Sequence, residues 1–247
     1  MALLEAQAVT VRFGGNTAVD TVDLSVEAGC VTGLIGPNGA GKTTLFNVIT
    51  GLQPPAGGRV LLDGADVTAL PPYKRAQRGL ARTFQRLELF VSLSVRDNIR
   101  VAGDVRNAWG RGHQRINTRT ETERIIELTG LGDVADRDVA DIPTGRARVV
   151  ELARALMTGP KVLLLDEPAS GQTESETRTF GELLRRLSSE DGLAICLVEH
   201  DVALVMEVCA QVHVLDYGRI LAVGTPTEIR NDPAVVAAYL GTETGAA

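Results

Sequence analysis

The sequence has few cysteines, no excess of basic residues and no long hydrophobic run, and each absence excludes a class of protein. Its three cysteines, Cys30, Cys196 and Cys209, are widely spaced and form no CxxC pair. They predict reduced, buried thiols rather than a disulfide framework or a cysteine metal site. The 25 basic residues are outnumbered by 31 acidic ones. The net charge of −6 argues against a nucleic-acid-coating surface, so we expect no nucleic-acid partner.

The hydrophobic segments are also short. VLLL before Asp166 and AICLV before Glu199 are among the longest, whereas a membrane-spanning helix needs about 20 apolar residues. The stretch MALLEAQAVTVRF has neither a basic region nor a long apolar one, so we expect no secretory signal. The 247 residues, 44% of them hydrophobic, can bury one core, or one core plus a lobe. If this protein serves a membrane, we expect it to dock onto another chain.

The stretch GPNGAGKT, Gly36 to Thr43, matches the phosphate-binding pattern G-x-x-x-x-G-K-[ST]. A buried apolar run, VTGLIG, leads into it, and a helical pattern begins near Lys42, which is the context that such a loop needs. In this loop backbone N–H groups surround phosphate oxygens, the lysine reaches the β- and γ-phosphates, and the threonine hydroxyl ligates Mg²⁺. The sequence thus predicts ATP and Mg²⁺ as cofactors. The expected nucleotide contacts are Gly36, Pro37, Asn38, Gly39, Ala40, Gly41, Lys42, Thr43 and Thr44.

The hydrophobic patterns around this loop predict an α/β protein. Two alternating runs between Leu3 and Val26, with turn residues 14–16 between them, predict antiparallel strands, and GGRVLLDGADV predicts a second hairpin. From Glu88 to Leu156 the pattern becomes helical, and we expect the polar stretch Gly103 to Asn117 to be a loop. Strands and helices then alternate, which predicts a parallel sheet flanked by helices. The expected fold is a P-loop NTPase core with an N-terminal antiparallel β patch and an inserted α-helical lobe.

Helix-capping patterns mark the later helices. Thr173 with Glu176 predicts a helix from Thr173 to Ser188, and Thr225 with Glu228 predicts the first of two short helices near the end of the sequence. A further helix is expected from Asp201.

Polar residues follow two of the apolar strands. Asp166 can join the magnesium shell, and Glu167 can polarise a water for in-line attack on the γ-phosphate. His200 ends the next strand, so it lies at the same edge of the sheet and can sense that phosphate. The two acids could instead be solvated loop residues, and a lone histidine is more often structural. The phosphate-binding loop upstream favours the catalytic interpretation for the two acids, and the position at the end of the next strand favours phosphate sensing for His200.

Two further residues, Gln85 and Phe13, are candidate site residues only because a phosphate-binding loop is present. Gln85 lies where sheet character gives way to the helical lobe, and its amide can bond the metal shell or the attacking water. Phe13 ends the first strand and can stack on a nucleobase, although core packing explains a single phenylalanine equally well.

The order of these elements resembles the ATP-binding subunit of an ABC transporter over nearly the whole chain. ARTFQRLELF, ELARALMTGPKVLLLDEP, LVEHDVALVMEVC and VGTPTEIRNDPAVVAAYLG are similar to the branched-chain amino-acid uptake group of that family. The resemblance implies one ABC ATPase domain over residues 1–247. Residues 1–85 and 156–247 would form the catalytic core with the antiparallel patch, and residues 86–155 the helical subdomain. Lys42, Gln85, Glu167 and His200 would be catalytic, and Thr43, Gln85 and Asp166 would hold the metal.

The resemblance also implies partners and a location. The family works as a head-to-tail dimer of two ATPase subunits, with two ATP molecules at the interface, beneath two membrane permease subunits. An extracytoplasmic solute-binding protein delivers the solute and so serves the ATPase only indirectly. Gln85 and the surface near Arg86 to Phe90 would contact the permease. The subunit would lie peripherally on the cytoplasmic face of the inner or plasma membrane.

Two segments depart from the family's pattern. Where the family signature reads LSGGQ, this chain has Ile142, Pro143, Thr144, Gly145 and Arg146. Proline offers neither a hydroxyl nor an N–H to the γ-phosphate held by the opposite subunit, whereas the Thr144 hydroxyl and the Gly145 N–H still can donate. The Arg146 guanidinium can donate as well, but a solvated surface arginine is an equally good interpretation. The loop after Glu167 reads SGQT instead of the usual SGLD or AGLN type. Both departures fall on elements that serve the partner's ATP, which favours a heterodimer with an ordinary partner over a homodimer with two weakened sites.

The sequence also allows functions other than an importer ATPase to be weighed against its motifs. A nucleotide-dependent dimerising module with low turnover fits the altered signature but not the intact Asp166–Glu167 pair. A repair or translation ATPase would need a coiled coil or a second cassette, and a small-molecule P-loop kinase would have no use for Gln85 or His200. Within transport, urea or another small solute is an alternative cargo, because the ATPase subunit does not touch what is carried.

Overall fold

The computed structural model describes residues 2–109 and 115–240 of the chain, and it has two sheets. The larger, six-stranded sheet has the order β10-β9-β3-β8-β7-β6. Its members are β3 (Val31–Ile35), β6 (Leu80–Arg82), β7 (Val162–Asp166), β8 (Ala194–Val198), β9 (Gln211–Asp216) and β10 (Arg219–Gly224). Only β10 pairs antiparallel, on β9. The carboxyl ends of β3, β7 and β8 therefore lie along one edge of the sheet.

The smaller sheet is antiparallel and forms the predicted N-terminal patch. Its order is β2-β1-β4-β5, from β1 (Ala2–Phe13), β2 (Asn16–Glu27), β4 (Gly57–Leu62) and β5 (Ala65–Asp66). Alternate residues of β1 and β2 are buried, as expected for strands with one covered face. These side chains pack with α1 (Lys42–Thr50) into a core that also takes Leu164, Cys196 and Leu215 from the large sheet.

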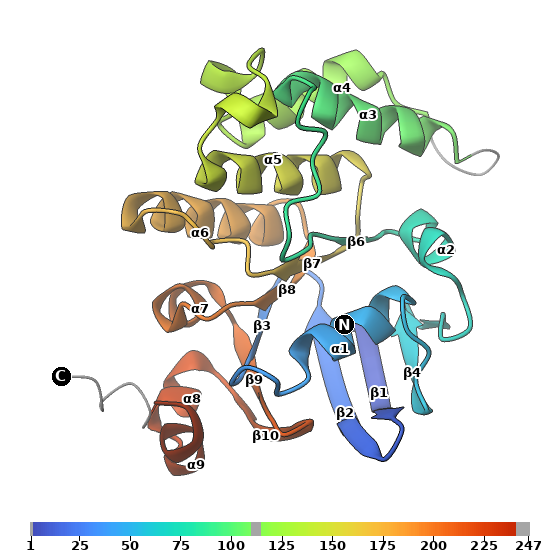
Figure 1. Cartoon of the computed structure of the whole chain (residues 1–247), viewed down its shortest axis with the longest axis vertical. Helices are drawn as coiled ribbons and strands as arrows, with labels where there is room; N and C mark the ends of the chain where they lie inside the picture. Colours follow the sequence, from blue (N-terminus) through green and yellow to red (C-terminus); the bar gives the residue numbers. More distant parts are fainter. Residues whose placement is uncertain (1, 110–114, 241–247) are drawn as a thin grey trace.

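The other face of the large sheet is covered by helices (Figure 1). Leu163 and Leu165 of β7 pack there with Leu184 of α6 (Glu174–Ser189) and Val205 of α7 (Val202–Val208). Because successive strand residues point to opposite faces, the five apolar positions of β8 serve both cores at once, which explains the continuous hydrophobic run in the sequence.

A separate helical lobe lies at one end of the molecule (Figure 1). It contains α3 (Val95–Asn107), α4 (Thr118–Leu128) and α5 (Thr144–Met157), and a third cluster of apolar side chains joins them. The short α2 (Pro72–Gln77) precedes β6, and α8 (Pro226–Asn231) and α9 (Pro233–Val235) follow β10. The α5 helix continues to Met157, past the expected end of the lobe at residue 155, and the division of the chain at those boundaries stays a prediction.

One expectation about the lobe is wrong in part. The sequence predicts a loop over the polar stretch from Gly103 to Asn117, but α3 continues through Asn107. Gly103 lies where a Cβ would come within 2.4 Å of Met157 Cε, so this glycine allows close helix packing rather than a turn. Asn107 then bonds the backbone of Ile116 in both directions. Residues 110–114 of this stretch lie outside the described part of the chain.

The capping predictions are confirmed. Thr173 and Glu176 form a capping box that starts α6 at Glu174, and Thr225 and Glu228 form one that starts α8. All three cysteines are free; Cys196 and Cys209 are buried, whereas Cys30 is only partly so. In the described ranges, none of the helices is long and apolar enough to cross a membrane.

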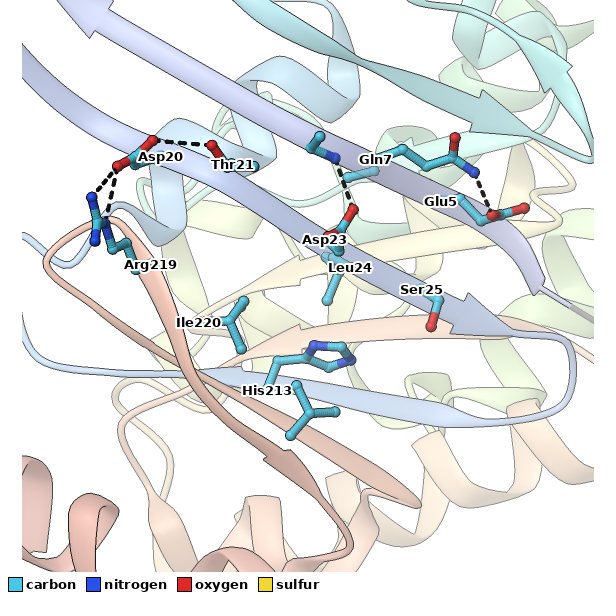
Figure 2. A pocket seen from close by; sticks show the side chains of 13 residues that line it. Glu5, Gln7, Asp20, Thr21, Asp23, Leu24, Ser25, His213, Arg219 and Ile220 are labelled. Atoms are coloured by element: carbon cyan, nitrogen blue, oxygen red, sulfur yellow. Dashed lines mark hydrogen bonds and ion pairs between the residues drawn. The ribbon is translucent and has the colours of Figure 1, made fainter.

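A groove of about 890 Å³ separates β2 from the β9–β10 hairpin. Figure 2 shows Asp20 bonded to Arg219 on one side of the view and Gln7 bonded to Glu5 on the other, with His213 of β9 between. The His213 side chain is 4% exposed and neither ring nitrogen has a hydrogen-bond partner. Burial lowers the pKa of His213 to about 4, so the ring is neutral at physiological pH.

Candidate nucleotide site

The phosphate-binding loop joins β3 to α1, as its sequence requires. Gly36, Gly39 and Gly41 all have positive φ, which L side chains rarely adopt. A Cβ at Gly36 would lie 1.9 Å from Leu215 O, and one at Gly41 would lie 2.6 Å from Ala18 O. Gly41 caps α1 without a side-chain hydrogen bond, so the first N–H groups of the helix stay available to an anion.

Lys42 lies within this loop. Its side chain is 7% exposed, and its ammonium donates to the carbonyl oxygens of Gly36, at 2.5 Å, and Pro37, at 3.0 Å. Burial lowers the pKa of Lys42, while the carboxylates of Glu167 and Asp166 oppose that shift. Phosphate oxygens can replace these carbonyl contacts, since an ammonium gains more from an anionic acceptor.

Asp166 ends β7 beside the loop. One of its oxygens, Oδ2, accepts from Arg82 Nη2 at 2.8 Å, and the other, Oδ1, is buried with no partner. A buried carboxylate oxygen without a donor is costly unless something else, such as a cation, completes it. Together with the exposed hydroxyl of Thr43, it therefore fits a hard divalent ion, which prefers oxygen ligands.

Arg82 is a member of this site that the sequence reasoning missed. Besides Asp166 it donates to Asn47 Oδ1 of α1, and its guanidinium lies over the rings of Phe46 and Phe84, 5.4 Å and 4.9 Å from their centroids. The pair with Asp166 links residues 84 positions apart, and no local pattern marks it.

The structure brings three of the predicted catalytic side chains together. Glu167 Oε2 accepts from Gln85 Nε2 at 2.9 Å, and Glu167 Oε1 lies 2.8 Å from His200 Nε2. The Glu167 carboxylate is 18% exposed, so water can reach it. Its backbone has φ of 51°, a left-handed conformation that is uncommon outside glycine and frequent at functional sites.

Phe13 is the last residue of β1, next to the turn into β2, and lies apart from the hydrophobic cores. Its side chain is 54% exposed, which excludes the core-packing interpretation and leaves the ring free to stack on a base. Whether it does so stays a prediction.

The altered signature turn begins α5, with Pro143 as a cap that makes no side-chain hydrogen bond. The sequence predicts Arg146 as a donor to the partner's γ-phosphate or as a solvated surface residue. In the structure it pairs with Asp133 and donates to Gly130 O within the same chain. The charge at the start of α5 thus already has a counterion.

Arg148, the second basic residue of that turn, points inward. It is 8% exposed and donates to the backbone carbonyls of Phe84 and Gln85 and to Glu151. Glu151 in turn accepts from the Glu88 N–H, so α5 holds the segment that carries Gln85 at both ends. Sequence reasoning missed these contacts between α5 and the Gln85 segment, because the partners are more than 60 residues apart.

The two segments that depart from the family pattern pack on each other. A Cβ on Gly171 would lie 3.3 Å from Thr144 Cγ2, and one on Gly145 would lie 3.2 Å from Gln172 Cγ. Both spacings are tight, so each glycine makes room for a side chain of the other segment.

An apolar groove of about 430 Å³ lies between the core and the helical lobe, next to the Gln85 segment. Its lining includes Leu52, Phe84, Phe90 and Val105, which are large hydrophobic side chains exposed by 38% to 53%. Exposed apolar side chains that gather in one groove typically mark an interaction site.

Comparisons with known proteins point to one family for this chain. The chain matches the family model described as ABC transporter over residues 19–170, and one described as branched-chain amino acid ATP-binding cassette transporter over residues 219–244. It is 39% identical over 258 residues to the high-affinity branched-chain amino acid transport ATP-binding protein BraF of Pseudomonas aeruginosa, covering 97% of this chain and 98% of BraF. It is also 39% identical over 249 residues to LivG of Escherichia coli K12, which has the corresponding description, with the same coverage. A crystal structure of MJ1267, an ATP-binding cassette of an ABC transporter in its ADP conformation, has a TM-score of 0.86 at 30% identity and covers 98% of this chain and 99% of MJ1267.

Proposed function

We propose, from the premise that this chain belongs to the ABC transporter family, that it is the ATP-binding and ATP-hydrolysing subunit of an import system for branched-chain amino acids. The observation that carries the ATPase activity is the Glu167 carboxylate, held between Gln85 and His200 at the strand edge beside the phosphate-binding loop. The cargo is inferred from what BraF and LivG are described as transporting.

In this proposal Glu167 orients the attacking water and takes its proton as the water adds to the γ-phosphorus. Gln85 and His200 fix the carboxylate by hydrogen bonds to its two oxygens. Lys42 and the N–H groups of the loop bind the phosphates and favour the charge that develops on their oxygens. Mg²⁺, held by Thr43, Asp166 and Gln85, would neutralise phosphate charge. Phe13 would stack on the base.

We assign the apolar groove to a permease subunit. Leu52, Phe90 and Val105 expose the apolar area, and the groove runs directly into the Gln85 segment, which Arg148 and Glu151 tie to α5. A permease segment seated there would push on the segment that carries Gln85. Binding of this kind gives a peripheral location at the cytoplasmic face of the membrane, with the extracytoplasmic solute-binding protein reached only through the permease.

We infer further that the second ATPase subunit is a different chain. The residues that serve this chain's own ATP match the family pattern, whereas Pro143–Arg146 and the loop after Glu167 do not, and Arg146 is engaged by Asp133. With an ordinary partner, the site that contains Lys42 hydrolyses ATP normally and the opposite site is weakened. A homodimer would have two weakened sites.

The test is ATP turnover of the purified chain, alone and with its co-purified partner. Lys42→Ala should abolish ATP binding, and Glu167→Gln should preserve binding but slow turnover by about 100-fold or more. If the wild-type complex hydrolyses ATP no faster than the Glu167→Gln complex, the result would instead support the low-turnover dimerising module. Full activity of the chain alone would refute the asymmetry.

Val105→Asp tests whether the apolar groove binds the permease. Val105 is exposed on α3 and outside the nucleotide site, so this change should abolish association with the permease and leave ATP binding by the chain intact. The cargo is tested separately, by measuring uptake of leucine and of urea by the wild-type transporter. Uptake of leucine supports an amino-acid importer, and uptake of urea alone supports the alternative cargo.

A further inference from the structure

We propose that Glu199 is a positioning residue for hydrolysis, which holds the two backbone segments that carry Glu167 and His200. This inference rests on the proposed function of those two side chains. Glu199 lies between β8 and His200, and its side chain is only 4% exposed. The hydrogen bonds of its carboxylate go to the backbone N–H groups of Ala169 and His200, so its effect on the reaction would pass through these neighbours.

The first segment is the turn after β7. There the left-handed backbone of Glu167 is fixed by hydrogen bonds on both sides: Glu167 N donates to Val198 O at 2.8 Å, and Ala169 N donates to Glu199 Oε1 at 2.7 Å. A residue in this conformation persists only where its surroundings determine it. The Glu199 carboxylate supplies one of the contacts that do so.

The second segment carries the histidine. Glu199 Oε2 accepts from the His200 N–H at 3.1 Å, and the backbone of Asp201, the cap of α7, also bonds the carboxylate. One buried carboxylate therefore fixes both the backbone from which Glu167 projects and the backbone from which His200 projects. The 2.8 Å contact between those two side chains depends on this shared support.

A carboxylate suits this position because it accepts hydrogen bonds through both oxygens and donates none. Glutamine has nearly the same shape, but its NH₂ would face an N–H group, so it can satisfy only one of the two segments. Glu199→Gln thus removes half of the support with little change in volume.

The experiment compares Glu199→Gln with wild type in the complex with the partner chain. We expect KM for ATP to change less than about threefold and kcat to fall by roughly 10-fold to 100-fold, because misplaced reacting groups cost rate rather than binding. The rate is expressed per bound nucleotide, measured by ATP-binding stoichiometry, so that misfolded protein does not count. Glu228→Gln is the matched control, since Glu228 accepts the Thr225 N–H at 2.7 Å in a capping box outside the site, and its kcat should equal that of wild type.

A double variant tests the route of the effect. If Glu199 acts through His200 and Glu167, adding Glu199→Gln to His200→Ala should lower kcat by clearly less than Glu199→Gln does in the wild-type background. Unchanged kcat in Glu199→Gln, or a fall equal to that in Glu228→Gln, refutes the positioning role. If Glu167→Gln slows turnover by about 100-fold or more while Glu199→Gln leaves kcat unchanged, only this inference fails. If neither variant affects turnover, the proposed function fails.

Discussion

Replacing His213 by leucine should stabilise the protein, because the ring occupies a buried position without satisfying either nitrogen. The side chain is 4% exposed and neither nitrogen has a hydrogen-bond partner. Burying an unsatisfied polar group costs about 1–3 kcal/mol, so His213→Leu should raise the free energy of unfolding by about that amount near neutral pH. Leu215, two positions further along β9 and on the same face as His213, packs in the apolar core, so this face accommodates apolar side chains.

The same substitution should reduce the dependence of stability on pH. In the unfolded chain the ring takes a proton below its ordinary pKa of about 6.5, whereas burial keeps the pKa of His213 at about 4 in the folded protein. Between these values the unfolded state binds more protons, so the folded state loses stability as the pH falls through this window. At pH 5 the loss from His213 alone is about 2 kcal/mol relative to neutral pH.

Urea unfolding followed by far-ultraviolet circular dichroism measures both effects, at about pH 7.5 and pH 5. All other titrating groups contribute equally to both proteins, so wild type is the control for the variant. The reasoning is refuted if His213→Leu is less stable than wild type near neutral pH, or if both proteins lose the same stability on acidification.

Three further outcomes follow from buried groups elsewhere. Arg75 is 2% exposed and donates to carbonyl groups at the end of α1, so Arg75→Met should lower the free energy of unfolding by about 3 kcal/mol, measured in the same urea assay. Gly36→Ala should abolish ATP binding, measured by calorimetry, because its Cβ would meet Leu215 O; intact affinity would contradict the loop geometry. Maleimide should label Cys30 in the native protein and the two buried thiols only after unfolding, since burial raises the pKa of Cys209 to about 12. The labelled positions are identified by mass spectrometry, and labelling of Cys209 in the native protein would contradict this prediction.

Residues whose role depends on local order could be predicted from the sequence. The phosphate-binding loop, the carboxylates at the end of β7 and the capping boxes of α6 and α8 are defined by neighbours within a few positions. The strand order then brings His200 to Glu167, because parallel neighbouring strands end at the same edge. These features need only short-range patterns and one topological rule.

The residues that sequence reasoning missed act over long separations. Arg82 reaches Asp166, and Arg148 reaches the backbone of Gln85, in each case across more than 60 positions. Arginine looks the same in a sequence whether it is solvated or buried. The prediction of a loop at Gly103 was wrong for a related reason. A glycine can mark a turn or a close contact between helices, and only the position of Met157 in the folded protein decides between them.

The tight fit of Gly171 against Thr144, and of Gly145 against Gln172, limits which substitutions these two segments can accept during evolution. A larger residue at 171 would have to displace the side chain at 144, and a larger residue at 145 would displace the one at 172. Replacing the signature turn alone by that of another cassette should therefore leave a poorly fitting junction, which a simultaneous exchange of residues 170–173 would repair. Across related cassettes the two segments should be inherited as a matched pair.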